Sequence, residues 1–232
     1  MFNGKLKAVT FSYDDGVVQD RRLVELFNYY GVKATFNLNS GMFGEKCSRM
    51  YGDILIHPDR LERGEIATLY RGHEIASHTI THPQLPNESD EEVIRQVEQD
   101  RLNLSNLCGY EVLGLAFPGN SPSSDERVER LVREHTGCRY ARAAGFTGGF
   151  AFPTDLYHIQ PTVYHVLWDD TMRLAGEFVE LRPNTPQVFY IMGHGYELDV
   201  ADGWRHMEEF LQFIAGREDV FYGTNRQVFL GE

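Results

Sequence analysis

Cysteine is scarce in this chain of 232 residues. The three cysteines, Cys47, Cys108 and Cys138, are odd in number and do not have the spacing of a zinc-binding motif. This pattern argues against a disulfide framework and is typical of reduced thiols. Stability must then come from a hydrophobic core, which a chain of this length is able to bury.

Long apolar runs are also missing. No segment approaches the roughly twenty apolar residues that a membrane-spanning helix needs. Residues 1–7 lead almost directly into the first strand-like run, which leaves no room for the charged and then apolar leader of a secreted protein. The sequence therefore predicts a cytoplasmic protein that is not embedded in a membrane.

Positive charge is in short supply. The chain has 22 Lys and Arg against 34 Asp and Glu, a formal net charge of −12, and its basic residues form no cluster. This balance argues against binding to nucleic acid or to an anionic membrane. The composition favours a soluble single domain over residues 1–232. The sequence does not reveal the oligomeric state.

The apolar pattern alternates between strands and helices. Strands are predicted over 7–12, 33–39, 74–77, 112–117, 139–143 and 188–192. Helices are predicted over 17–30, 58–70, 89–107, a segment after Ser123, and 204–215. The remaining long segments, 40–56 and 144–161, are predicted to be loops. This alternation favours an α/β fold, either a largely parallel barrel or an open sheet covered by helices.

Two short segments about sixty residues apart carry the chemistry. The segment TFSYDDG ends one apolar run with Asp14 and Asp15, and SHTITHP follows another with His78 and His82. A carboxylate and two imidazoles suit a divalent metal with open positions, which makes its bound water acidic enough to attack near neutral pH. The two histidines face the same way if their segment turns like a helix. Gly16 relieves the turn at the end of the first strand.

Each motif also has an ordinary structural explanation. An Asp-Asp-Gly sequence is commonly a turn after a strand, and a His-x-x-x-His pair is commonly two surface or core histidines. Both motifs here end predicted strands, and the chain has no other cluster of this kind. We therefore favour a metal-dependent hydrolase.

These segments resemble the first two motifs of the polysaccharide deacetylase family, the NodB-homology carbohydrate esterases of the family 4 type. The family pattern Thr-Phe-Asp-Asp-Gly appears with two residues inserted, and the pattern His-Ser/Thr-x-x-His appears unbroken. The resemblance implies that Asp14 is the catalytic base and that Asp15, His78 and His82 bind the metal, for which we expect Zn²⁺. It also implies a deformed (β/α) barrel, a single domain with its site at the carboxyl ends of the strands.

The third family motif, Arg-x-Pro-Tyr, aligns with the segment AFPGN and has lost its arginine and its aromatic residue. Pro118 and Gly119 remain as candidate substrate-binding residues, since a backbone N–H near Gly119 can serve as an oxyanion donor. The missing cation could come from Arg142, at the end of the next predicted strand. The alternative for Arg142 is a surface salt bridge.

The last two motifs are matched more loosely. An apolar strand ends in His194 between two glycines, and the resemblance makes His194 the general acid that protonates the leaving amine. The ordinary pKa of histidine suits that task, although a histidine in a turn is the alternative. Trp168 is a loose counterpart of the tryptophan in the fourth motif, and it either walls the substrate pocket or belongs to the core.

The function implied is the removal of N-acetyl groups from an amino sugar or a short oligosaccharide. Two alternatives stay open, the hydrolysis of another small linear or cyclic amide such as a ureide, and carbohydrate binding without catalysis on a decayed scaffold. The intact first, second and fifth motifs argue against decay, and the lost arginine argues for it.

Overall fold

The sheet of this protein is parallel and strongly curled. The structure is a computed structural model that describes residues 2–232. Its main sheet has the strand order β7-β6-β5-β2-β1-β9-β8, and β10 pairs with β1 beside this path. Its pairings are all parallel. The strands are β1 Lys7–Asp14, β2 Ala34–Leu38, β5 Glu74–Ser77, β6 Gly114–Ala116, β7 Tyr140–Arg142, β8 Val163–Tyr164, β9 Gln187–His194 and β10 Val220–Tyr222.

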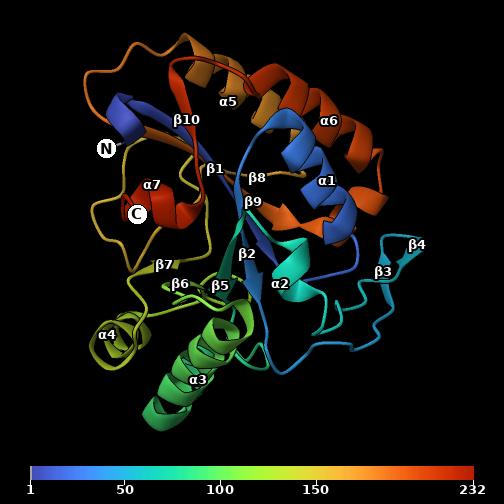
Figure 1. Cartoon of the computed structure of the whole chain (residues 1–232), viewed down its shortest axis with the longest axis vertical. Coiled ribbons are helices and arrows are strands. Elements are labelled where there is room, and N and C mark those ends of the chain that lie inside the picture. The colour runs from blue at the N-terminus through green and yellow to red at the C-terminus, as the bar shows by residue number, and fades with distance from the viewer. Residues whose placement is uncertain (1) are drawn as a thin grey trace.

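Helices cover the outside of the sheet, which makes the fold the deformed (β/α) barrel that was expected (Figure 1). Helices α3 and α4 pack together on the side of β5, β6 and β7, while α1, α5 and α6 form a second group. The helices are α1 Asp20–Tyr30, α2 Ile66–Leu69, α3 Asp90–Cys108, α4 Glu126–His135, α5 Trp168–Glu180, α6 Gly203–Ile214 and α7 Asn225–Phe229. Short 3-10 turns are η1 Phe2–Gly4, η2 Leu85–Asn87 and η3 Gly195–Asp199.

The central strand β1 positions the first motif. All of its residues are buried, as expected for a strand inside a parallel sheet covered by helices. Its register with β9 runs unbroken from Lys7 opposite Gln187 to Asp14 opposite His194. On its other side, Asp14 pairs with Asn37 of β2. The carboxyl ends of these strands therefore bring three polar side chains to one place.

Most of the predicted elements are present, but one helix prediction is wrong. Only Ile66–Leu69 of the segment 58–70 is helical. The preceding residues are held by hydrogen bonds to distant backbone groups, from Arg60 N to Glu45 O and from Leu61 N to Gly16 O. Such long-range bonds replace the local bonds that a helix would form.

Other segments contain strands or helices that were not predicted. The segment 40–56, predicted to be a loop, contains an antiparallel hairpin of β3 Arg49–Tyr51 and β4 Ile54–Ile56, which projects from the body in Figure 1. The elements β8, α5, β10 and α7 were not predicted. The segment 144–161 contains no helix or named strand, as expected.

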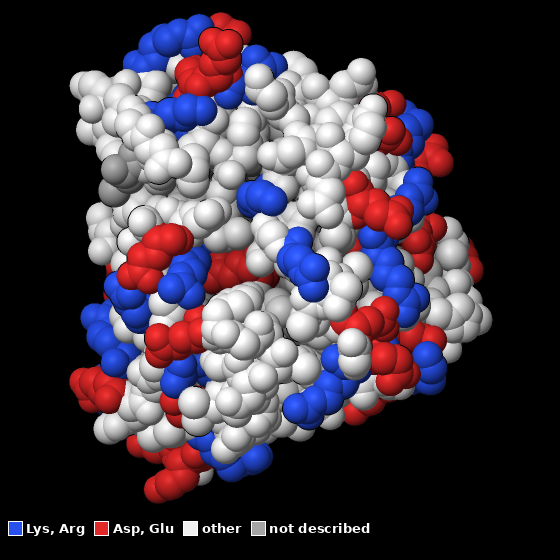
Figure 2. All heavy atoms as spheres, viewed as in Figure 1, with Lys and Arg blue, Asp and Glu red and all other residues white. Residues whose placement is uncertain are grey.

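The surface carries both signs of charge. Figure 2 shows acidic and basic side chains interspersed over one face of the molecule. The three cysteines are free thiols, with Cys47 exposed and Cys138 buried. Within residues 2–232, no helix has both the length and the apolar composition that crossing a membrane requires.

Candidate active site

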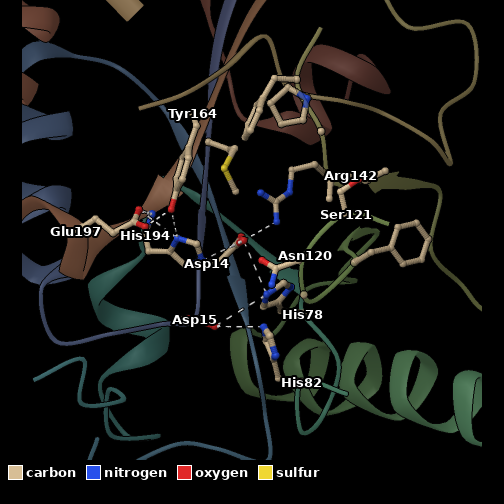
Figure 3. A pocket seen from close by; sticks show the side chains of 18 of the residues that line it. Asp14, Asp15, His78, His82, Asn120, Ser121, Arg142, Tyr164, His194 and Glu197 are labelled. Carbon is tan, nitrogen blue, oxygen red and sulfur yellow. Dashed lines mark hydrogen bonds and ion pairs between the residues drawn. The ribbon is translucent and has the colours of Figure 1, made fainter. Parts of the chain in front are cut away.

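A cavity of about 660 Å³ opens at the carboxyl ends of the strands. Most of the residues singled out in the sequence line it, and Figure 3 shows how they converge. They are Asp14, Asp15, His78, His82, Gly119, Arg142 and His194. The structure thus brings together residues from the ends of β1, β7 and β9 and from the loops after β5 and β6. The two that are farthest apart in the sequence, Asp14 and His194, are separated by 180 residues.

Asp15, His78 and His82 aim their ligand atoms at one another. The Nε2 atoms of His78 and His82 lie 4.0 and 3.9 Å from Asp15 Oδ1, and the three ligand atoms lie within 4.8 Å of one another. Asp15 Oδ1 is buried and receives no hydrogen bond, so it has an unused lone pair that could bind a cation. One carboxylate and two imidazoles are ligands that a divalent metal accepts, and the residues therefore fit the expected ion.

The protonation of His78 also suits a metal ligand. Its Nδ1–H donates a hydrogen bond of 2.8 Å to the carbonyl oxygen of Ala116 in β6. This bond leaves the lone pair of Nε2 facing Asp15, the arrangement that orients a ligating histidine. Burial lowers the pKa of His78 to about 4, so the imidazole is neutral near pH 7.

Arg60 lies against the same oxygen of the Asp15 carboxylate. Its Nη1 lies 2.9 Å from Asp15 Oδ1 but directs its hydrogen bond to the main-chain oxygen of Asp15. Burial alone would raise the pKa of Asp15, and the Arg60 guanidinium and the nearby histidines instead hold it far below its ordinary value. The carboxylate is therefore ionised and keeps a lone pair toward the cavity.

The segment between the two histidines is not helical, so the helix-like turn that would have made them face the same way is absent. The backbone is left-handed at Thr79, with φ 68°, and at His82, with φ 59°. Thr79 Oγ1 accepts a hydrogen bond from His82 N at 3.1 Å. Two such strained residues bend the chain sharply, and this bend, rather than helical spacing, places the imidazole rings 4.8 Å apart.

Buried Asp100 of α3 fixes the start of this segment. One of its oxygens accepts a hydrogen bond of 2.6 Å from Ser77 Oγ and one of 3.3 Å from His78 N. The other accepts a bond of 2.7 Å from Ser40 N. A helix outside the barrel thus sets the position of the loop that carries both histidines.

Asp14 is held at two points. Its Oδ2 lies 2.5 Å from Nη2 of Arg142, and its Oδ1 accepts a hydrogen bond of 2.7 Å from Asn37 Nδ2. Burial alone would raise the pKa of Asp14, but the Arg142 guanidinium, with His78 and His194, lowers it below its ordinary value. The predicted contact of Arg142 with Asp14 is therefore present. Because the side chain of Arg142 is only 5% exposed, the alternative interpretation, a surface salt bridge, is wrong.

His194 faces Asp14 across the cavity. Its Nε2 lies 3.9 Å from Asp14 Oδ2, while its Nδ1 lies 3.2 Å from Oε2 of Glu197. Burial alone would lower the pKa of His194, but the ionised Glu197 raises it to about 9. The imidazole is therefore protonated near neutral pH, with its Nε2 side free to face a substrate.

Glu197 is a residue that the sequence reasoning missed. Besides His194, it accepts hydrogen bonds from His165 Nε2, at 2.9 Å, and from the Tyr164 hydroxyl. The other ring nitrogen of His165 lies 3.0 Å from the Tyr13 hydroxyl. The signal in the sequence was a glutamate three residues after the candidate acid. Its contact depends on the turn η3, which was not predicted.

Two of the predicted substrate residues do not line the cavity. Pro118 is buried away from it. Trp168 begins α5, with its ring 5.5 Å from His165 and stacked at 5.3 Å on His206 of α6. Of the two alternatives for Trp168, the core position is the one observed, because Trp168 packs against the hydrophobic core and not against the cavity. Gly119 does line the cavity.

The first motif needs one correction. Strand β1 pairs with β9 through Asp14 without a bulge, so nothing marks an insertion between Thr10 and Asp14. The shorter segment SYDDG matches the family pattern directly, with Tyr13 in the place of phenylalanine. Tyr13 is buried in the core, as an aromatic residue at this position of the strand would be.

Comparison with known proteins decides the family. A model of the family described as polysaccharide deacetylase matches residues 3–141, more than half of the chain. The chain belongs to the polysaccharide deacetylase family. No curated protein matches the sequence.

Solved structures agree with this family's fold. A putative polysaccharide deacetylase from Mycobacterium smegmatis has a TM-score of 0.68 at 15% identity, covering 98% of this chain and 90% of that one. The PuuE allantoinase has a TM-score of 0.66 at 13% identity, covering 97% and 88%. The deacetylase PplD of Streptococcus pyogenes, in complex with acetate, has a TM-score of 0.53 at 15% identity over 64% of this chain. The match spans 61% of the length of PplD. At these identities the likeness concerns the fold.

The metal ligands can be tested directly. Replacing His82 by Ala removes one of the three candidate ligands, and we expect Zn²⁺ affinity to fall more than roughly 100-fold, beyond the usual cost of losing an outer-shell partner. The fold should persist, because the side chain of His82 faces the cavity and is 31% exposed. Calorimetric titration of the metal-free protein measures the affinity. His135→Ala on the surface of α4 is the matched control, and an unchanged affinity in His82→Ala would show that the ligand is another residue.

Proposed function

We propose that this protein is a metal-dependent N-deacetylase that acts on an N-acetylated amino sugar or a short oligosaccharide. The observation that carries the proposal is the juxtaposition of two units in one cavity. One is the carboxylate of Asp14, held by Arg142. The other is the group of Asp15, His78 and His82, whose donor atoms suit a divalent ion, for which we expect zinc.

The residues of the first unit suit a general base. A divalent ion bound by Asp15, His78 and His82 would acidify a water molecule and polarise the substrate carbonyl. Asp14 takes the proton of the attacking water while the water oxygen forms a bond with the acetyl carbon. Arg142 keeps Asp14 ionised and, together with Asn37, fixes the plane of its carboxylate. A guanidinium suits this role because it stays charged and its planar group is rigid; here one of its nitrogens, Nη2, donates to Asp14 Oδ2.

His194 supplies the other proton. As the bond between the acetyl carbon and nitrogen breaks, protonated His194 donates its Nε2 proton to the leaving amine. Glu197 holds the opposite ring nitrogen and keeps the imidazole charged until then. The N–H of Gly119 forms no hydrogen bond within residues 2–232 and is available to the oxyanion of the tetrahedral intermediate.

A second candidate is the hydrolysis of another small linear or cyclic amide, such as a ureide. The observation in its favour is the similarity of the whole fold to an allantoinase, together with a third motif that lacks the family's arginine and aromatic residue. Carbohydrate binding without catalysis is disfavoured, because Arg142 occupies the place next to Asp14 that a decayed site would leave empty.

Turnover on a substrate panel separates these candidates. We expect the zinc-loaded protein to release acetate from oligosaccharides of N-acetylglucosamine and to leave allantoin intact. Asp14→Asn should retain zinc yet lose about 10²- to 10⁴-fold in kcat, since its amide cannot accept the water proton. Asp15→Asn should instead weaken zinc binding.

Zinc content and turnover of the two variants are measured side by side. Equal zinc loss in both would show that the roles of the two aspartates are divided wrongly. Release of ammonia or a ureido acid from allantoin, without acetate from any sugar, would favour the second candidate.

The pH dependence tests the role of His194. Its raised pKa keeps it protonated up to about pH 9, so kcat/KM should fall only above that range. Glu197→Gln removes the negative charge that raises the pKa of His194 most. Asp14 and Asp15 still oppose burial, but less strongly, so the pKa of His194 falls. The alkaline limb of the kcat/KM profile should move to lower pH by at least about one unit. The proposed role would be contradicted by an alkaline limb that stays in place.

A further inference from the structure

Arg49 is a cation at the cavity without a carboxylate partner. Among lysine and arginine residues, Arg49 and Arg142 line the cavity, and Arg142 forms an ion pair with Asp14. Arg49 forms no ion pair within residues 2–232. Arg49 is exposed, and its side chain donates one hydrogen bond of 3.1 Å to the Tyr196 hydroxyl. Most of its five N–H donors therefore face solvent and are accessible to a ligand.

The position of Arg49 is set by the hairpin β3–β4, which stands beside the barrel in Figure 1. Arg49 pairs with Ile56, and Ile56 is buried in a small apolar cluster with Val17 and Tyr196. Because side chains alternate along a strand, Arg49 and Tyr51 share the face toward the cavity, and both line it. The hairpin is thus anchored next to the first motif and presents a guanidinium to the site.

Arg49 lies a short way from the reacting groups. Its guanidinium carbon is 5.3 Å from the centre of the Tyr196 ring, and that ring is 5.0 Å from the ring of His194. Added together, these two distances put the guanidinium carbon at most about 10 Å from the ring centre of His194, the proposed proton donor. A substituent on the sugar that bears the reacting amide, or on the next one, can span this distance.

Two aromatic residues of the lining suit a sugar ring. Phe146 and Tyr164 stack with their ring centres 5.7 Å apart and an angle of 7° between their planes. Both rings line the cavity, and Phe146 is 47% exposed. A flat aromatic face offers apolar contact to the C–H groups of a sugar, while Arg49 offers a charged contact to a group on that sugar.

We propose that Arg49 binds a carboxylate or phosphate carried by the substrate, so that the preferred substrate is an acidic N-acetylated amino sugar. This proposal rests on the deacetylase function of the cavity. The chain carries a net charge of −12, and three acidic residues, Asp14, Asp15 and Glu197, also line the cavity, so an anion would be repelled without a dedicated cation. The planar fork of a guanidinium binds both carboxylate and phosphate in two places.

The test compares three related substrates on the zinc-loaded protein. They are N-acetylglucosamine, which is neutral, its 3-O-lactyl ether, which adds a carboxylate, and its 6-phosphate. The measured quantity is kcat/KM for each acidic sugar divided by kcat/KM for the neutral one. We expect Arg49→Gln to lower at least one of the two ratios about tenfold or more, mainly through KM, since a hydrogen bond to a charged group is lost. The ratio that falls identifies the anion.

Two further variants make the result specific. Arg63→Gln, at an exposed position outside the cavity, changes the net charge by the same amount and should leave both ratios unchanged. Arg49→Lys keeps the charge without the fork and should restore part of the lost ratio. If Arg49→Gln changes neither ratio, or lowers activity equally on all three sugars, Arg49 only supports the hairpin and the proposal is wrong.

Binding separates this proposal from the proposed function. Calorimetric titration of Asp14→Asn, with and without Arg49→Gln, measures the affinity for the same three sugars without turnover. A preference for an acidic sugar that disappears with Arg49→Gln supports the anion site even if no sugar is cleaved, in which case only the deacetylase function fails. Equal affinity of Asp14→Asn for the neutral and both acidic sugars would overturn the anion site.

Discussion

The ion pair between Asp14 and Arg142 is the interaction on which the rest of the site depends. Both side chains are buried, and a buried carboxylate without such a partner would hold its proton at neutral pH and could not act as a base. The pair also depends on the curl of the sheet. Three strands separate β7 from β1, so in a flat sheet the two would be roughly 19 Å apart, too far for a direct contact. The deformed barrel is therefore a requirement of the chemistry.

Strand register supplies the remaining geometry. Asp14 stands opposite His194 on one side and Asn37 on the other, so the proposed base and the proposed acid are neighbours by pairing alone. A slip of one residue would turn Asp14 to the other face of the sheet. The proposed metal ligands add a further demand, because they need left-handed backbone at Asp15 and His82. Such conformations cost energy and are kept where the surrounding structure fixes them.

The sequence predicted what local patterns encode. The first two motifs and the strands that carry them could be predicted, since each motif lies at a strand end. The contact of Arg142 with Asp14 was predicted from the arginine missing in the third motif, whereas the curl of the sheet that allows it has no local signal. Glu197 and Arg49 could not, because their roles depend on a 3-10 turn and a hairpin that have no periodic signal. The helix predicted over 58–70 failed for a related reason. Its backbone groups bond to Glu45 and Gly16, partners far away in the sequence.

The most direct test of this account is the zinc content and kcat of Arg142→Lys. Lysine keeps the charge, but its flexible ammonium does not hold a donor at the fixed position that Arg142 Nη2 takes beside Asp14 Oδ2. The account predicts zinc binding close to that of the wild-type protein and a kcat reduced on the order of 100-fold, the usual effect of misplacing a reacting group. Wild-type turnover in this variant would contradict the account, because Asp14 would then be oriented by something other than Arg142.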